Sequence, residues 1–231
     1  MKNILCLLVL LASMSLTAQT KSELLKHFEG YYNQMKSQGD VQGVINAMTH
    51  LNVLAPNQQR LDTLAYIYAS EGRNLEALNT IGIDNNATDS NINTEVKALA
   101  LKALNQPKRA LVFYEVLFQK EPNAYLAYEI ADLKTQIQDI AGAKASVDYG
   151  LANVKADMKK AFYESQQPYE VSLKGALTYL KALIVFNMNQ NDNIDQAIAL
   201  LDEAITMDAN FNLAKISKDA LVTRKNEPKK N

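Results

Sequence analysis

The chain has 231 residues, 48% of them hydrophobic, with 24 basic and 25 acidic side chains and a formal net charge of −1. This hydrophobic content is enough for a sizeable core and argues against a disordered chain. The balanced charge provides no overall electrostatic attraction for nucleic acid or an anionic membrane, so neither is expected as a partner. Eight glycines and five prolines are few for an all-β protein, which needs many tight turns. The composition therefore favours helices.

Residues 1–18 have the pattern of a secretory signal peptide, with an apolar run over residues 4–12 and small residues at the end. We expect cleavage after Ala18 and an exported protein, periplasmic or secreted. An uncleaved anchor is the alternative, but the apolar run is shorter than the about 20 residues that span a bilayer. No integral membrane segment is expected in the mature chain. The single cysteine, Cys6, lies within this leader, which would leave the mature chain without a disulfide.

Apolar residues at steps of three and four predict helical hairpins over residues 22–56 and 58–87, followed by a polar linker. Two more are predicted over residues 92–122 and 123–167. Turn residues spaced 33 apart define the repeat: Gly39, Gly72 and Asn105. The small residue expected at the helix contact recurs at steps of 33 and then 35: Ala77, Ala110 and Ala145. We interpret the longer step as residues added at the fourth turn.

These units resemble tetratricopeptide repeats, whose pattern combines bulky residues early in the first helix, small residues at the helix contact, an aromatic residue in the second helix and a terminal proline. Five signature positions are matched in the third unit: Ala98, Leu101, Ala110, Tyr114 and Pro122. The resemblance, of the exported bacterial type, implies an all-α fold. This fold would be a right-handed α-solenoid of about five antiparallel helix hairpins with a C-terminal capping helix.

The fifth unit, over residues 169–209, departs from the repeat, because Ala197 follows Ala145 by 52 residues. Apolar residues keep helical spacing past the normal end of the fourth unit, which predicts a long projecting helical hairpin over residues 158–184. A short extra helix over residues 157–166 is the alternative. The capping helix is expected over residues 211–224 and a disordered tail over residues 225–231.

The resemblance implies binding of a protein or peptide through a concave groove lined by the first helix of each hairpin. The corresponding positions are Glu29, Asn33, Lys36, Asp62, Tyr66, Glu95, Leu99, Lys102, Glu129, Leu133 and Gln136. Tyr66 is the first candidate for mutation, since an exposed aromatic ring supplies rigid contact area at small entropic loss. The alternative function is a structural or oligomerising module that uses the 158–184 hairpin.

Signatures of catalysis are missing from the sequence. It has no HExxH, CxxC, glycine-rich phosphate loop or GxSxG turn to accompany its two histidines, His27 and His50. We therefore predict that the protein is not an enzyme and has no cofactor or catalytic metal.

Overall fold

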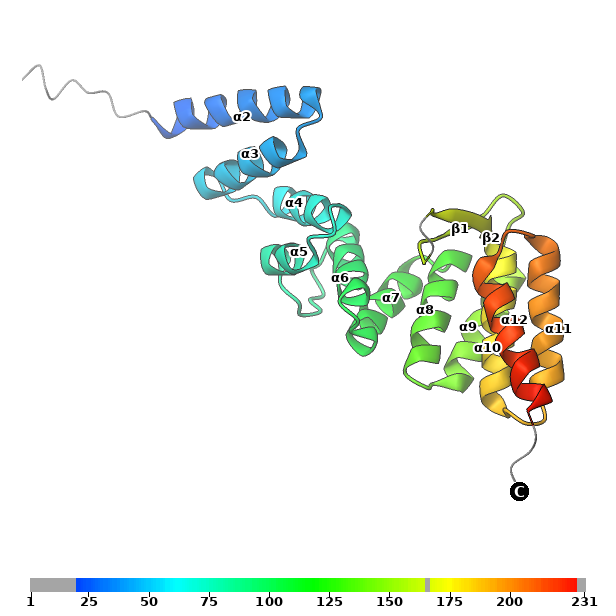
Figure 1. Cartoon of the computed structure of the whole chain (residues 1–231). Coiled ribbons are helices and arrows are strands. Elements are labelled where there is room, and N and C mark those ends of the chain that lie inside the picture. Colours follow the sequence, from blue (N-terminus) through cyan, green and yellow to red (C-terminus); the bar gives the residue numbers. More distant parts are fainter. Residues whose placement is uncertain (1–19, 165–166, 228–231) are drawn as a thin grey trace, which may run out of the picture. The chain divides into compact units, whose positions relative to one another are not determined.

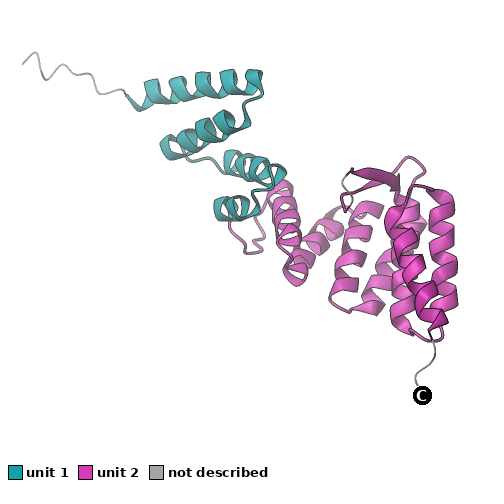
Figure 2. Ribbon diagram, viewed as in Figure 1, with its two compact units in different colours: residues 1–81 teal, residues 82–231 magenta. Residues whose placement is uncertain are grey.

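The computed structural model describes residues 20–164 and 167–227, which contain eleven helices, labelled as in Figure 1. The expected signal peptide lies outside the described residues. In the part of the chain that the structure describes, no helix is both long and apolar enough to cross a membrane. The chain divides into two compact units, Met1–Ile81 and Gly82–Asn231 (Figure 2).

The first unit contains two helix hairpins. Its helices are α2 (Lys21–Gln38), α3 (Val41–Leu54), α4 (Gln58–Ser70) and α5 (Asn74–Ile81). Three of them begin after a residue whose side chain accepts a hydrogen bond from a backbone N–H of the first turn: Thr20, Asp40 and Asn57. Ile45, Met48 and Leu64 form a buried cluster that joins α3 to α4.

The second unit continues with three hairpins and a final helix. Its helices are α6 (Asn91–Ala103), α7 (Pro107–Lys120), α8 (Ala124–Gln136), α9 (Ile140–Asn153), α10 (Leu173–Met188), α11 (Ile194–Met207) and α12 (Asn212–Asn226). Helix α12 packs on α11 and buries Ala214 and Leu221, as a cap requires. The five hairpins and the cap are thus confirmed. Residues 225–226 belong to α12 and not to a disordered tail.

Four helix turns share one backbone geometry. In each turn, the residue two positions before the next helix has a positive φ. The value is 71° in Gly39, 73° in Gly72, 55° in Asn105 and 64° in Gln138. The next N–H reaches back to a carbonyl five residues earlier, as from Asp139 to Lys134 at 2.9 Å, which satisfies the end of the helix. These turns are 33 residues apart throughout, so the expected 35-residue step is wrong.

The contact position of the fourth unit is correspondingly Ala143 and not Ala145. Ala143 lies 33 residues after Ala110 and, like Ala77 and Ala110, is fully buried, whereas Ala145 is exposed. A left-handed conformation is uncommon for a residue other than glycine, asparagine or aspartate. Gln138 therefore gave no turn signal in the sequence, and the frame was misplaced by two residues.

The segment between α9 and α10 is a β-hairpin, and both helical predictions for it are wrong. Strands β1 (Lys159–Phe162) and β2 (Tyr169–Ser172) pair antiparallel, with Phe162 opposite Tyr169, where the long hairpin over 158–184 or the short helix over 157–166 was expected. Figure 1 shows this ribbon beside the ends of α8 and α10. The apolar step of four residues from Met158 to Phe162 fits a strand as well as a helix, since four is a multiple of the strand period of two.

The β-hairpin is anchored on the helices by rings and by a carboxylate. The Phe162 ring lies 5.7 Å from that of Tyr169 and 5.1 Å from that of Phe211, just before α12. The N–H of Ser172 donates to Asp208 Oδ1 at 2.9 Å, and its hydroxyl donates to Oδ2 at 2.6 Å. The insertion is thus part of the core of the second unit and not a free projection.

A lysine occupies a core position in α6. Lys97 lies 33 residues after the buried Leu64, and its side chain is fully buried. Its Nζ donates to Asp89 Oδ2 and to the carbonyl oxygen of Asp84, both at 2.7 Å. Buried charge is tolerated only when it is paired in this way. Lys97 therefore holds the linker between α5 and α6 against the helix.

Candidate partner-binding site

The 33-residue frame gives equivalent positions on the first helix of each hairpin. One such position is occupied by Asn33, Tyr66, Leu99 and Asp132. Tyr66 is 50% exposed and Leu99 43% exposed, and Asn33 is also open to solvent. The side chain of Asp132 is 25% exposed. Within each unit, this row marks the helix surface that remains available to a partner.

In the first unit, four of the five predicted groove residues are exposed: Glu29, Asn33, Lys36 and Tyr66. The fifth, Asp62, is only 4% exposed and accepts a hydrogen bond from Gln58 Nε2 at 2.8 Å. The expectation that Asp62 is open to a partner is therefore wrong. Its carboxylate is used within α4.

In the second unit, the residues predicted for the groove on α6 and α8 differ in exposure. Glu95, Leu99 and Gln136 are exposed, and Lys102 and Glu129 are partly buried. Leu133 is fully buried and cannot contact a partner in this structure. The strict 33-residue equivalent of Leu99 is Asp132, one residue before Leu133.

A cavity of about 410 Å³ lies between α6 and α8, with α7 behind it. It brings together three residues predicted for the groove: Glu95, Leu99 and Glu129. Leu117, Leu126 and the rings of Tyr114 and Tyr125 also line it. Most binding sites combine apolar walls with a few polar groups, as this cavity does.

A network of charged side chains borders the cavity. Lys102 Nζ on α6 pairs with Glu129 on α8 and lies 2.8 Å from Asp132 Oδ2. Lys160 Nζ on β1 lies 2.8 Å from Glu129 Oε1, and 5.1 Å from the centre of the Tyr128 ring. The network connects α6, α8 and the β-hairpin. The charge of Lys102 is paired with carboxylates of the protein itself.

The pairing controls the ionisation of this network. Burial by itself would raise the pKa of the Glu129 carboxyl, but the ammonium groups of Lys102 and Lys160 outweigh burial and hold that pKa below its usual value. Burial would likewise lower the pKa of the Lys102 ammonium, but Glu129 and Asp132 hold it above its usual value. Both groups are therefore charged at neutral pH.

Tyr114 is the least satisfied polar residue of the cavity. It is only 3% exposed, and its hydroxyl has no hydrogen-bond partner among the described residues. Burial, with the nearby carboxylates of Glu129, Glu95 and Asp132, raises the pKa of this phenol. The hydroxyl is therefore neutral, protonated and close to negative charge.

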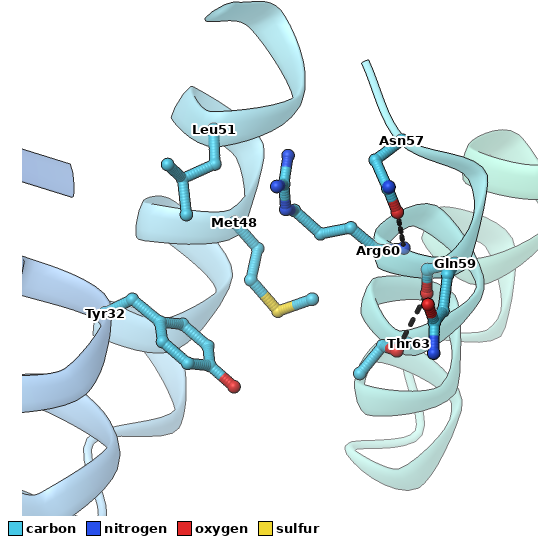
Figure 3. A pocket seen from close by; sticks show the side chains of 7 residues that line it. All are labelled: Tyr32, Met48, Leu51, Asn57, Gln59, Arg60 and Thr63. Carbon is cyan, nitrogen blue, oxygen red and sulfur yellow. Dashed lines mark hydrogen bonds between the residues drawn. The ribbon is translucent and has the colours of Figure 1, made fainter. Parts of the chain in front are cut away.

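The first unit has a cavity of its own, of about 330 Å³, between α2, α3 and α4 (Figure 3). The Tyr32 ring and the Met48 side chain point into it, opposite Thr63 on α4. Arg60 extends toward α3, and its Nη1 donates at 2.9 Å to the carbonyl of Ala55, the residue just after that helix. None of the residues predicted for the groove lines this cavity, and its polar groups hold the linker between α3 and α4.

The two histidines pack around one phenylalanine. The ring of Phe28 stacks on His50 at 4.3 Å, and His27 meets it edge-on at 5.2 Å. Within residues 20–164 and 167–227, no group of three or more histidine, cysteine, aspartate or glutamate side chains is placed to hold a metal ion.

The sequence did not point to Lys160, Tyr125 or Asp132 as residues of this surface. Asp132 could have been found by extending the 33-residue frame without change. Tyr125 is 42% exposed at the start of α8, and its hydroxyl accepts the N–H of Lys159 at 3.2 Å. Lys160 comes from the insertion, which no repeat pattern places.

Solved structures similar to this chain include two tetratricopeptide repeat proteins. A tetratricopeptide repeat protein from Parabacteroides merdae ATCC 43184 has a TM-score of 0.65 and 16% identity, over 88% of this chain and 75% of its own length. YrrB, described as a TPR protein with an unusual peptide-binding site, has a TM-score of 0.64 and 12% identity, over 87% and 98%. Neither a family model nor a curated protein matches the sequence. The chain has the tetratricopeptide-repeat fold.

Proposed function

We propose that the protein is a non-catalytic scaffold that binds a protein or peptide partner through the first helices of its hairpins. The observation that carries this proposal is the cavity between α6 and α8, where Glu95, Leu99 and Glu129 lie together as the resemblance to tetratricopeptide repeats implies. Helical repeats bury their cores between neighbours and leave an extended surface for recognition. The peptide-binding site named for YrrB, a structural neighbour, is consistent with this use of the fold.

A displayed library of random short peptides, selected on the full chain, tests the proposal. Selected peptides should lose binding to Leu99→Asp, because a charge replaces an exposed apolar contact on α6. Val112→Asp is a matched control, since Val112 is 44% exposed on α7 and Leu99 is 43% exposed. Equal binding to both variants, or no selected peptide at all, would exclude this surface as the binding site.

We place this activity in the cell envelope, on the basis of the signal-peptide pattern in residues 1–18. Expression of the full chain in a bacterial host, followed by mass spectrometry of the periplasmic fraction, tests the location. The expected product begins at Gln19. Recovery of the uncleaved chain from the cytoplasm would contradict export.

The alternative function, an oligomerising module, depended on the long helical hairpin predicted over residues 158–184. The structure has a β-hairpin and the start of α10 there. The β-hairpin found there packs its Phe162 and Val171 into the core of the same chain. No second function is proposed.

A further inference from the structure

The β-hairpin has an open strand edge beside the candidate partner-binding surface. Its sheet has two strands within the described residues, so each strand has one edge with no neighbouring strand (Figure 1). The unpaired N–H and C=O groups of such an edge form a template for another extended segment. The two edges of this hairpin differ in how far the chain itself uses these groups.

The outer edge of β2 is covered by residues between α11 and α12. The N–H of Ser172 donates to Asp208 Oδ1 at 2.9 Å. The carbonyl oxygen of Glu170 accepts from Asn210 Nδ2 at 3.2 Å. Side chains of the same chain therefore take two of the main-chain groups that this edge presents, which leaves little of it for another strand.

The outer edge of β1 is open at Ala161. The N–H of Leu173 donates to the carbonyl oxygen of Met158 at 2.8 Å, so these two residues form a hydrogen-bonded pair at the end of the ladder. Hydrogen-bonded and non-hydrogen-bonded pairs alternate along antiparallel strands, and the pair of Ala161 and Glu170 is therefore of the second kind. The N–H and C=O of Ala161 thus point away from β2, and neither has a hydrogen-bond partner within the described residues.

This open edge continues the surface formed by α6 and α8. The hydroxyl of Tyr125, which lines the α6–α8 cavity, accepts the N–H of Lys159 at the start of β1. Ala161 lines a second cavity, of about 360 Å³, together with Lys102 and Asp132. An extended segment that leaves the first cavity past Tyr125 can therefore continue along β1.

The exposed side chains at β1 favour an acidic segment. Lys159 is exposed and takes part in no ion pair within the described residues, whereas Lys160 is paired with Glu129. Tyr163 directly follows the strand and is 74% exposed, which leaves its ring available to the same segment. Opposite charges and aromatic side chains stabilise cross-strand pairs. Pairing of two β1 strands would instead gather Lys159 and Lys160 of both copies in one sheet, which like-charge repulsion disfavours.

We infer that an extended acidic segment of the partner protein adds to β1 as a third strand. One residue of the segment exchanges two main-chain hydrogen bonds with Ala161, a carboxylate lies opposite Lys159, and an apolar side chain contacts the Tyr163 ring. Main-chain bonds give such complexes their affinity, and side chains give them specificity. This inference rests on the proposed function, since it adds the conformation and charge of the bound segment.

Two synthetic peptides test the main-chain pairing. The full chain is titrated with acetyl-Thr-Phe-Thr-Val-Thr-Glu-Thr-amide, whose central valine would pair with Ala161 in an antiparallel strand, and with the same peptide N-methylated at that valine. The N-methylated peptide loses one N–H and keeps every charge and side chain, so it should bind about tenfold more weakly. Equal affinity for the two peptides would overturn the inference.

Backbone amide exchange, followed by NMR, locates the pairing on the original chain. The first peptide should slow exchange at Ala161, whose N–H is free, and leave exchange at Glu170 on β2 unchanged. Unchanged exchange at Ala161 would overturn the inference. A dimer that forms without peptide, with Ala161 already protected, would identify a second copy as the occupant and would also overturn it.

Two proline variants assign the edge. Ala161→Pro removes the outward N–H of β1 and should abolish peptide binding, whereas Glu170→Pro, the matched change on β2, should leave binding unchanged. Proline is tolerated at edge positions whose N–H makes no ladder bond, so both variants should keep the far-UV circular dichroism of the original chain. The reverse pattern would overturn the assignment to β1. If Ala161→Pro alters the fold, amide exchange in the original chain decides the question.

The Leu99→Asp variant distinguishes this inference from the proposed function. If library-selected peptides lose binding to Leu99→Asp but do not slow exchange at Ala161, the groove on the first helices remains and the third strand is excluded. If they slow exchange at Ala161 and bind Leu99→Asp as well as the original chain, the third strand remains and that groove is excluded.

Discussion

Replacing Asp89 with alanine would leave the ammonium group of Lys97 buried without its carboxylate. The Lys97 side chain has no exposed area, and Asp89 Oδ2 lies 2.7 Å from its Nζ. Breaking a buried pair from one side destabilises proteins by about 3–5 kcal/mol. The Asp89 side chain is 11% exposed, and the carbonyl of Asp84 would still accept a hydrogen bond from Lys97 Nζ. We therefore expect a loss at the lower end of this range, about 3 kcal/mol. For a chain of this size that loss lowers the melting temperature by about 6–12 °C.

Equilibrium urea unfolding followed by circular dichroism measures this loss of free energy. The control is the double variant Asp89→Ala/Lys97→Met, which removes both charges and fills the core position with an unbranched apolar side chain. It should recover at least half of the lost stability, because an apolar pair can replace a buried ion pair at little loss. The reasoning is refuted if Asp89→Ala unfolds within about 0.5 kcal/mol of the original chain, the usual range for surface substitutions, or if the double variant is no more stable than Asp89→Ala.

Three further predictions address the repeat frame and the charged network. Ala143→Leu should reduce stability by about 1–3 kcal/mol through overpacking, while Ala145→Leu, at an exposed position two residues away, should have little effect in the same urea assay; equal effects would restore the 35-residue step. Gln138→Gly should raise the free energy of unfolding by about 1 kcal/mol, because φ is 64° there, and Gly72→Ala, at φ 73°, should lower it; an unchanged Gln138→Gly would contradict the left-handed turn. The pKa of the Glu129 carboxyl is lowered in the folded state. The ionised carboxylate therefore stabilises the fold fully at pH values above its usual pKa of 4.5, and this stabilisation disappears as the pH falls through the folded pKa. Glu129→Gln should therefore lose about 2 kcal/mol at pH 7 and less at pH 3, as measured by urea unfolding at both pH values; an equal loss at both would show that the carboxylate is not paired.

The repeated fold was predictable because close packing constrains residue type at fixed intervals. Only small residues fit where two helices of a hairpin cross, and Ala77 and Ala110 met that requirement in the expected places. Gly39 and Gly72 met the requirement of a left-handed turn. At Gln138 the same backbone geometry is imposed by the surrounding helices on a residue that does not prefer it. Local preference could not place that turn, and the contact position of the fourth unit was therefore assigned to Ala145 in place of Ala143.

The candidate site was predictable only as a surface. The frame placed Glu95 and Leu99 on the open side of α6, because residues that do not pack in the hairpin must face outward. It could not show that Asp62 is buried or that Tyr114 lacks a partner for its hydroxyl, since both depend on neighbouring side chains. The strand pairing of residues 159–172 was likewise undetermined, because a four-residue apolar step fits two periods.

The β-hairpin affects the net charge of the surface beside the α6–α8 cavity. Without Lys160, the carboxylates of Glu129 and Asp132 would share one ammonium group, that of Lys102. Lys160 provides a second cation at 2.8 Å from Glu129 Oε1, so this network has two charges of each sign. The neighbouring cavity is also lined by Glu95 and Glu121, which form no ion pair within the described residues, and by Lys120. An irregular insertion in a regular repeat therefore changes the charge of this surface, because Lys160 balances one of the two carboxylates that Lys102 alone would have to pair.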